Sequence, residues 1–394
     1  MSWSHVNNSE ISSTNSPPNI TNAEELLRTL NDKLALRYLP VIIYMFLLIF
    51  TGLFGNVLVI IVYVRKKTKS SLNYFIINLA ILDLLTVVIG MPTEIADLRY
   101  SIMFYAPAAC KALRTVESLS TMGSIVTLMA VAIDRYNRIC KYGKQMTIEK
   151  AKRICIIAII IGIFTCWPAA IVFGKKTKDV GIPGVYGVDC STDDSMKGTK
   201  YPLVYYGLLF LYFVVCVIFF TVVYTKIVLF IRKQKKKGNI SQNSSRKKTK
   251  EPKSLSGETS FSDIEKDQNN GKEKQRNKIQ TDCVHQKLEE TKSRRKIHAS
   301  KTTLMLGIVT VVFVLSFLPF LTVMVIRNIV KNFEDILSES AEVFYKFCLK
   351  SYFINNSVNP IIYSFMNVQF RGDVKKIFSQ QTRCCEKKIN IYQQ

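Results

Sequence analysis

Four groups of polar residues and prolines stand inside long apolar stretches of the chain, where lipid makes polar groups costly and a purpose is expected. Asp83 follows Asn78-Leu79-Ala80-Ile81-Leu82 within one stretch, and Asp134-Arg135-Tyr136 ends the next. Two later stretches hold Phe313-Val314-Leu315-Ser316-Phe317-Leu318-Pro319 and Asn359-Pro360-Ile361-Ile362-Tyr363. A carboxylate that deep in an apolar stretch needs a compensating partner, and an adjacent Asp and Arg can form an ion pair. The sequence shows no nucleophile–base pair or intramembrane metal triad, so it argues against an enzyme.

Seven apolar stretches must position these residues. A bilayer core about 30 Å thick takes roughly 20 apolar residues of helix to cross. Unbroken stretches without period-two alternation exclude a transmembrane barrel. The predicted fold is an all-α membrane protein, a bundle of seven transmembrane helices. The expected spans are Tyr38–Val64, Leu72–Leu98, Ala106–Ile139, Ala151–Phe173, Tyr201–Ile231, Thr302–Val330 and Ala341–Phe365.

The charge of the chain predicts its orientation. It carries 54 basic and 29 acidic residues, a net charge of +25. Most basic residues fall in the connections that an odd number of spans puts on one side, which makes that side cytoplasmic and the N-terminus extracellular. The same placement explains the charge without a nucleic-acid partner. The regions on the basic side are Arg65-Lys66-Lys67, Arg138 to Arg153, Arg232 to Lys301 and the C-terminal tail.

The chain divides into an extracellular tail (1–37), a membrane domain (38–367) and a C-terminal segment (368–394). Residues 1 to about 30, and the cytoplasmic loop 233–297, have few large apolar residues, so we predict disorder there. Asn7 and Asn19 begin glycosylation sequons. After the last span, Phe370 and Val374 fall on one face of a helix expected to lie on the membrane surface. Cys384 and Cys385 beyond it are either palmitoylated or plain cytosolic thiols.

Together and in this order, the four motifs resemble the rhodopsin-like (class A) family of G-protein-coupled receptors, over residues 38 to about 385. The resemblance implies a plasma-membrane receptor that binds an extracellular ligand in the outer half of the bundle and activates a heterotrimeric G protein. It also implies arrestin and receptor kinases as partners, besides membrane lipid. A transporter or channel is the alternative class. The internal repeats common in transporters are not visible here.

The resemblance assigns roles to particular residues. It implies a Cys110–Cys190 disulfide and a pocket for sodium and water, with the alternative that the pocket's polar groups are merely satisfied by backbone or water. Arg135 would be released toward the G protein, although Asp134 and Arg135 could form a purely structural salt bridge. Phe317 stands where most members have Trp. The implied pocket residues are Asp83, Ser124, Asn355 and Asn359. The implied switch residues are Asp134, Arg135, Tyr136, Tyr224, Phe313, Phe317, Pro319, Asn359, Pro360 and Tyr363, of which the two tyrosines Tyr224 and Tyr363 could instead belong to an interfacial belt.

The expected ligand site has a wide mouth with mixed charges. Glu117 lies where amine receptors have an Asp, so it either binds a cationic ligand group or neutralises Arg114, three residues earlier on the same helix face. The mixed charges, and a β-hairpin expected around 185–190, favour a neuropeptide or peptide hormone over a biogenic amine. The expected lining residues are Glu94, Asp97, Arg114, Glu117, Thr121, Phe317, Met324, Arg327, Tyr345, Lys346, Leu349 and Phe353.

Overall fold

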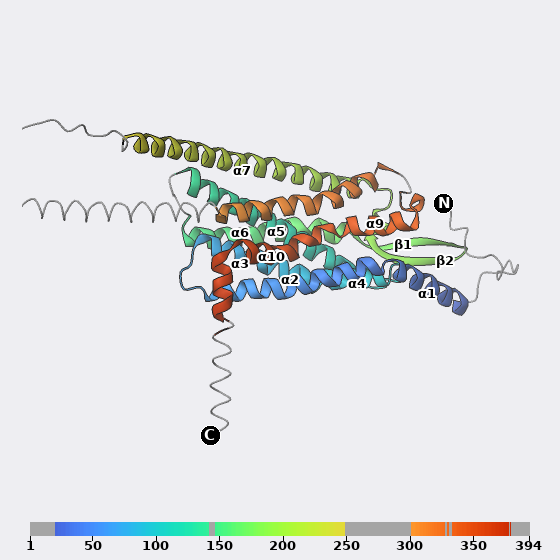
Figure 1. The fold of residues 1–394 in the computed structure, drawn as a ribbon. Coiled ribbons are helices and arrows are strands. Elements are labelled where there is room, and N and C mark those ends of the chain that lie inside the picture. Colours follow the sequence, from blue (N-terminus) through green and yellow to red (C-terminus); the bar gives the residue numbers. More distant parts are fainter. Residues whose placement is uncertain are drawn as a thin grey trace, which may run out of the picture.

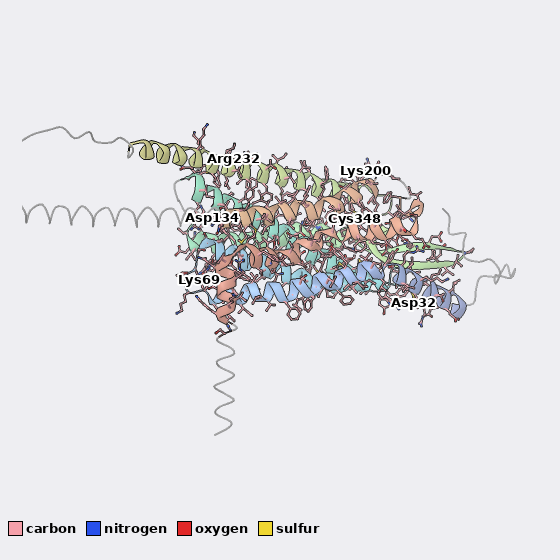
Figure 2. All side chains as sticks on the ribbon, in the orientation of Figure 1. Asp32, Lys69, Asp134, Lys200, Arg232 and Cys348 are labelled. Carbon is pink, nitrogen blue, oxygen red and sulfur yellow. A yellow bond between two sulfur atoms is a disulfide. The ribbon has the colours of Figure 1, made fainter. Side chains whose placement is uncertain are left out.

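Long helices lie side by side and form a bundle with a small β-hairpin at one end (Figure 1). The computed structural model describes residues 20–141, 146–248, 301–327, 329–330, 333–377 and 379. The predicted modification sites Asn7, Asn19, Cys384 and Cys385 lie outside these residues. Lys69, Asp134 and Arg232 lie toward one end of the bundle, and Asp32 and Lys200 toward the other (Figure 2). Connections that alternate between the two ends are the arrangement expected of a multi-pass membrane protein.

Within the described residues, six helices are long and apolar enough to cross a membrane. Their bounds agree with the predicted spans to within a few residues, and many large apolar side chains on their outer faces are exposed, as lipid contact requires. The six are Leu39–Arg65 (α2), Ser71–Arg99 (α3 Ser71–Leu85, η1 Thr86–Gly90 and α4 Met91–Arg99), Pro107–Cys140 (α5), Ile148–Val172 (α6), Tyr201–Gln234 within α7 (Tyr201–Lys248), and Lys301–Arg327.

The seventh predicted span is built from shorter pieces. It consists of α9 (Glu339–Leu349), the 3-10 turn η4 (Ser351–Phe353) and α10 (Ile354–Met366). At the break, the Ser351 hydroxyl donates to the carbonyls of Cys348 at 2.9 Å and Ser316 at 2.7 Å. Backbone irregularity inside a membrane is tolerated where such bonds replace helical ones. The bundle therefore has six unbroken spans and a seventh that changes phase at η4.

The second span contains a π-helical turn, η1, just before Pro92. A π-turn adds a residue to the helix and rotates everything beyond it. After this rotation Glu94 is fully buried and Asp97 is 7% exposed. The irregular turn thus directs two carboxylates toward the interior of the bundle.

The second outer loop forms the expected hairpin of β1 (Phe173–Ile182) and β2 (Val185–Thr192). The strands are antiparallel, with Lys176 opposite Asp189. Gly184 takes a φ of 79° in the tight turn between them, a conformation that suits glycine. The predicted Cys110–Cys190 disulfide is confirmed and ties β2 to the outer end of α5.

The prediction of a disordered N-terminal tail to about residue 30 is wrong from residue 20 onward, where α1 (Ile20–Arg37) begins. Leu27 and Leu34 are buried in one face of α1. Buried Asn31 donates from Nδ2 to the Arg99 carbonyl at 3.0 Å and accepts from the Ile102 amide at 3.4 Å. Composition understated this segment because a helix that packs on a neighbour needs only a narrow apolar face.

The predicted disorder of loop 233–297 is also wrong at its start, since α7 remains helical to Lys248. Lys, Gln and Arg, which are common there, are good helix formers. The rest of that loop lies outside the described residues. The expected surface helix forms at residues 368–377 and lies crosswise to the long helices (Figure 1). Its Phe370 is buried beside Tyr63 and Tyr363.

Candidate functional site

A cavity of about 140 Å³ opens among the outer halves of the spans, beneath the hairpin. Ten of the predicted ligand residues lie in its wall: Asp97, Arg114, Glu117, Thr121, Phe317, Met324, Arg327, Tyr345, Lys346 and Leu349. Glu94 and Phe353 are fully buried behind that wall. Sequence reasoning missed Phe173, Asp189, Tyr205, Tyr206, Tyr212, Glu334, Lys350 and Tyr352. Tyr205 and Tyr212 lie two helical turns apart on the same helix. Lys350 follows the predicted residue Lys346 by one helical turn. Helical spacing could therefore have suggested Tyr205, Tyr212 and Lys350.

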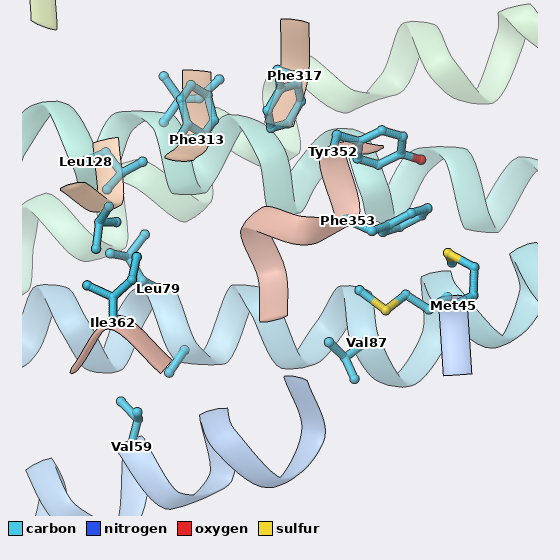
Figure 3. Packing of buried hydrophobic residues seen from close by; sticks show 14 of the residues in the cluster. Met45, Val59, Leu79, Val87, Leu128, Phe313, Phe317, Tyr352, Phe353 and Ile362 are labelled. Carbon is cyan, nitrogen blue, oxygen red and sulfur yellow. The ribbon is translucent and has the colours of Figure 1, made fainter. Parts of the chain in front are cut away.

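Aromatic rings of the sixth and seventh spans pack together beside the cavity (Figure 3). The ring of Phe317 lies 4.8 Å from Phe313 and 5.7 Å from Tyr352, and Tyr352 lies 4.2 Å from Phe353. Phe317 keeps the ring expected at this point but has no N–H to donate. A ligand that enters the cavity would press on side chains of both the sixth and the seventh spans.

Two acids and two bases form a buried cluster beside the cavity. Arg114 lies 2.5 Å from Glu94 and 3.0 Å from Glu117, and Lys350 forms an ion pair with Glu94 on its other side. The cluster joins the second, third and seventh spans and its four charges balance. Of the two roles considered for Glu117, the structure shows the pairing with Arg114.

A second set of charges closes the rim of the cavity. Glu334, in η3 (Phe333–Ile336), lies 3.3 Å from Arg327 and 3.8 Å from Lys176 and accepts a 2.9 Å hydrogen bond from Tyr345. Burial acts to raise the pKa of Glu334, but Arg327 and Lys176 outweigh it and lower the pKa to about 2. Arg327 also donates to Ser191 at 3.3 Å. Glu334 therefore stays ionised and holds the hairpin against the sixth and seventh spans.

Midway through the bundle, Asp83 accepts hydrogen bonds from Asn356 at 3.0 Å and Asn359 at 2.9 Å. Asn356, which follows Asn355 in the chain, was not among the expected residues. Three more oxygens in this region are buried without a partner among the described residues: Ser124 Oγ, Asn355 Oδ1 and Asn359 Oδ1. Carboxylate, hydroxyl and amide oxygens are the ligand set of a hard cation. The residues present thus fit a sodium ion.

The motif at the opposite end of α5 forms a buried ion pair. Asp134 is fully buried and Arg135 is 1% exposed, and the two carry opposite charges in contact. Asp134 also accepts from the Ser71 hydroxyl and the Met146 amide, each at 3.3 Å. Arg135 Nε has no hydrogen-bond partner in the part of the chain the structure describes. One face of the arginine is therefore still available for a partner.

The remaining switch candidates lie in the third, fifth, sixth and seventh spans. The Tyr224 hydroxyl lies 3.2 Å from the Thr310 hydroxyl, which links the fifth and sixth spans. Tyr363 is 1% exposed, and its hydroxyl has no hydrogen-bond partner among the described residues. Tyr136 is half-buried, and Lys141 lies over its ring. Pro319 and Pro360 lie inside helices of the sixth and seventh spans, at positions where a helix can bend.

The fold and these sites define a class: a seven-helix membrane receptor with a cavity at one end and a buried Asp-Arg pair at the other. A family model described as "7 transmembrane receptor (rhodopsin family)" matches residues 55–363, and the chain belongs to that family. The chain is therefore a receptor and not an enzyme.

Curated relatives extend along most of the chain. The thyrotropin-releasing hormone receptor of Bos taurus is 26% identical over 376 residues, which cover 90% of this chain and 82% of the relative. Neuromedin-U receptor 2 of Rattus norvegicus is 22% identical over 356 residues, 88% of this chain and 77% of the relative. The alpha-2A adrenergic receptor of Danio rerio is 27% identical over 384 residues, 88% of this chain and 93% of the relative.

The buried cluster of four charges predicts how substitutions of its members change the free energy of unfolding. Glu94→Gln leaves two bases against one acid, and Lys350→Met leaves the reverse, so each should lower the free energy of unfolding by about 3 kcal/mol or more. The double variant restores the balance through Arg114 and Glu117 and should recover most of the loss. Thermal unfolding of purified receptor in detergent measures these differences.

Glu339→Gln is the control for this series. It removes an acid whose side chain is 78% exposed and paired only at the surface with Arg37, so its effect should stay below about 1 kcal/mol. A loss in the double variant equal to the sum of the two single losses would show that the charges are not coupled.

Proposed function

We propose that this chain is a plasma-membrane receptor, with its N-terminus outside, that binds an extracellular neuropeptide or peptide hormone and activates a heterotrimeric G protein. One observation carries the proposal. The single helix α5 holds Arg114 and Glu117 in the cavity wall at its outer end and Asp134 and Arg135 in a buried pair at its inner end. Such a helix joins a ligand site directly to a surface for a signalling partner.

A peptide suits the cavity better than a small amine. An amine receptor needs a free carboxylate on α5 for the ligand ammonium, and here Glu117 is already bound to Arg114. The wall also mixes acidic, basic and tyrosine side chains contributed by the spans and β2. Among the relatives, two are named for thyrotropin-releasing hormone and neuromedin U and one is named adrenergic. The pairing of Glu117 with Arg114 therefore favours a peptide ligand over an amine. A biogenic-amine receptor is the second candidate function.

The inner end of the bundle would serve the other partners. We propose that arrestin and receptor kinases meet the same cytoplasmic face as the G protein, as is common for receptors that are switched off after signalling. We propose glycans on the extracellular side of the membrane, at Asn7 and Asn19. We propose palmitoyl chains on the cytoplasmic side, at Cys384 and Cys385. These modifications remain proposals because all four residues lie outside the described part of the chain.

The oxygens around Asp83 support a bound sodium ion. Asp83 supplies the charge, and Ser124, Asn355 and Asn359 supply oxygens that lack partners among the described residues. A cation there would satisfy these buried groups, whose desolvation is otherwise uncompensated. Asn356 and Asn359 hold the Asp83 carboxylate in position from the seventh span.

The G-protein proposal is tested at Arg135. Membranes that contain the receptor should accelerate nucleotide exchange on a panel of purified heterotrimeric G proteins relative to membranes without it. Arg135→Ala should abolish this acceleration, because Arg135 is the buried base with an unused donor at the inner end. Surface expression should remain close to that of the unmodified receptor.

Arg138→Ala is the matched control, since Arg138 is half-buried on the same helix less than one turn away. It should retain exchange. Unchanged exchange by Arg135→Ala in every heterotrimer that the receptor activates would contradict the role given to Asp134-Arg135-Tyr136.

The sodium proposal predicts a cation-specific stabilisation. A ligand that binds only the folded state raises its stability with ligand concentration. Sodium chloride should therefore raise the melting temperature of the purified receptor more than choline chloride does at the same ionic strength. Asp83→Asn should remove the difference between the two salts. If the variant keeps the full sodium effect, Asp83 does not hold the ion.

A further inference from the structure

The charges in the cavity wall are not all paired. Arg114 and Glu117 pair with each other, Lys350 pairs with Glu94 behind the wall, and Arg327 pairs with Glu334. Within the part of the chain that the structure describes, the other charged lining residues, Asp97, Asp189 and Lys346, form no ion pair within 4.0 Å. Two acids and one base remain, an excess of one negative charge.

Asp97 is the deeper of the two acids. It is 7% exposed, and its Oδ1 atom is buried with no hydrogen-bond partner among the described residues. The π-turn η1 directs it inward, and its side chain reaches the cavity wall. A buried carboxylate without a partner is costly, so this position is explained best by a group that arrives from outside.

Asp189 faces the same space from β2. Its cross-strand neighbour is Lys176, but the ammonium of Lys176 lies 3.8 Å from Glu334 instead. Asp97 and Asp189 line the same cavity and, as like charges, repel each other. A cation between them would relieve that repulsion and gain two charge-assisted contacts.

The two carboxylates belong to one braced unit. Cys190, next to Asp189, is joined to Cys110 of α5. The Val188 amide donates to the Ile102 carbonyl at 2.8 Å, and the Phe104 amide donates to the Val188 carbonyl at 2.9 Å. These bonds tie β2 to the loop that follows α4, the helix that carries Asp97. A site held in place before binding loses little entropy when the ligand arrives.

Lys346 is held away from a direct salt bridge. Its ammonium lies 5.2 Å from the centre of the Tyr38 ring, at the junction of α1 and α2. Tyr38 in turn donates to Glu342, one turn before Lys346 on α9. Lys346 can therefore reduce the negative potential at Asp97 and Asp189 without forming an ion pair with either carboxylate.

We propose that Asp97 and Asp189 form a subsite for a basic group of the ligand, a lysine or arginine side chain or a free N-terminal amine. The proposal rests on the peptide-receptor function above and assigns the charge-reading role to these two residues, while Glu117 stays committed to Arg114. Peptides that carry a basic group at the end that enters the cavity are preferred over neutral or acidic ones.

Selection from a peptide library tests this assignment without knowledge of the natural ligand. Full-length receptor in lipid nanodiscs is used to select from a displayed library of short random peptides, with receptor-free nanodiscs as background. The unmodified receptor should enrich lysine, arginine or a free N-terminus. A selected basic peptide should bind about tenfold to a hundredfold more weakly to Asp97→Asn or Asp189→Asn. Asp189→Lys should shift the enrichment toward aspartate and glutamate.

Asp179→Asn is the matched control. Asp179 lies on β1 of the same hairpin, is exposed and is absent from the cavity wall, so this variant should select like the unmodified receptor. Asp97→Glu keeps the charge and should retain the basic preference. If Asp97→Asn fails to fold, the two Asp189 variants, in the loop, carry the test alone.

Each outcome decides between the claims. Enriched peptides with no basic preference, or the same preference in Asp97→Asn and Asp189→Asn as in Asp179→Asn, would overturn the subsite and leave the peptide receptor standing. A second arm measures binding of simple arylalkylamines. If no peptide is enriched, and the receptor binds an amine that Asp97→Asn does not bind, the subsite for a basic group is supported. The proposal that the ligand is a peptide is then wrong. Binding of neither class would overturn both.

Discussion

The constraint on which this structure depends is that lipid offers no hydrogen bonds, so each buried polar group needs a partner inside the protein. The chain meets this constraint by linking spans far apart in sequence. Asn78 donates to Thr127 at 2.8 Å, and Asn56 donates to the Asn356 carbonyl at 2.8 Å. Glu94 binds bases from the third and seventh spans at once. These polar contacts, more than apolar packing alone, set which faces of the helices meet.

The same constraint makes the exceptions informative. Among the described residues, most buried side-chain atoms without a partner fall in three places: beside the outer cavity, around Asp83, and at the inner end near Arg135. The helix α5 contributes to all three through Glu117, Ser124 and Arg135. Unpaired groups are costly in a folded protein, so their concentration on one path through the bundle points to a ligand, an ion and a signalling partner as the groups that complete them.

The sequence was sufficient for the spans because length and hydropathy determine them. It also suggested ten residues of the cavity wall, since motif spacing places residues on helix faces. It left open whether Glu117 pairs with Arg114, and it could not reveal the Glu94–Lys350 pair, whose partners are 256 residues apart. It also missed Asn356, which donates a hydrogen bond to Asp83 from the position next to Asn355. The helix α1 was missed because its apolar face is narrow and its role depends on a neighbour.

We propose that the two ends of α5 are coupled, so that a ligand in the cavity and a G protein at Arg135 favour the same state. Coupling between two binding sites is reciprocal and typically changes affinity by about tenfold. The direct measurement is the affinity of a cavity-binding peptide for the receptor in nanodiscs, with and without a nucleotide-free G protein. The peptide should bind more tightly when the G protein is present, and Arg135→Ala should show no such gain. Equal peptide affinity in the presence and absence of a bound G protein would contradict the coupling of the two ends.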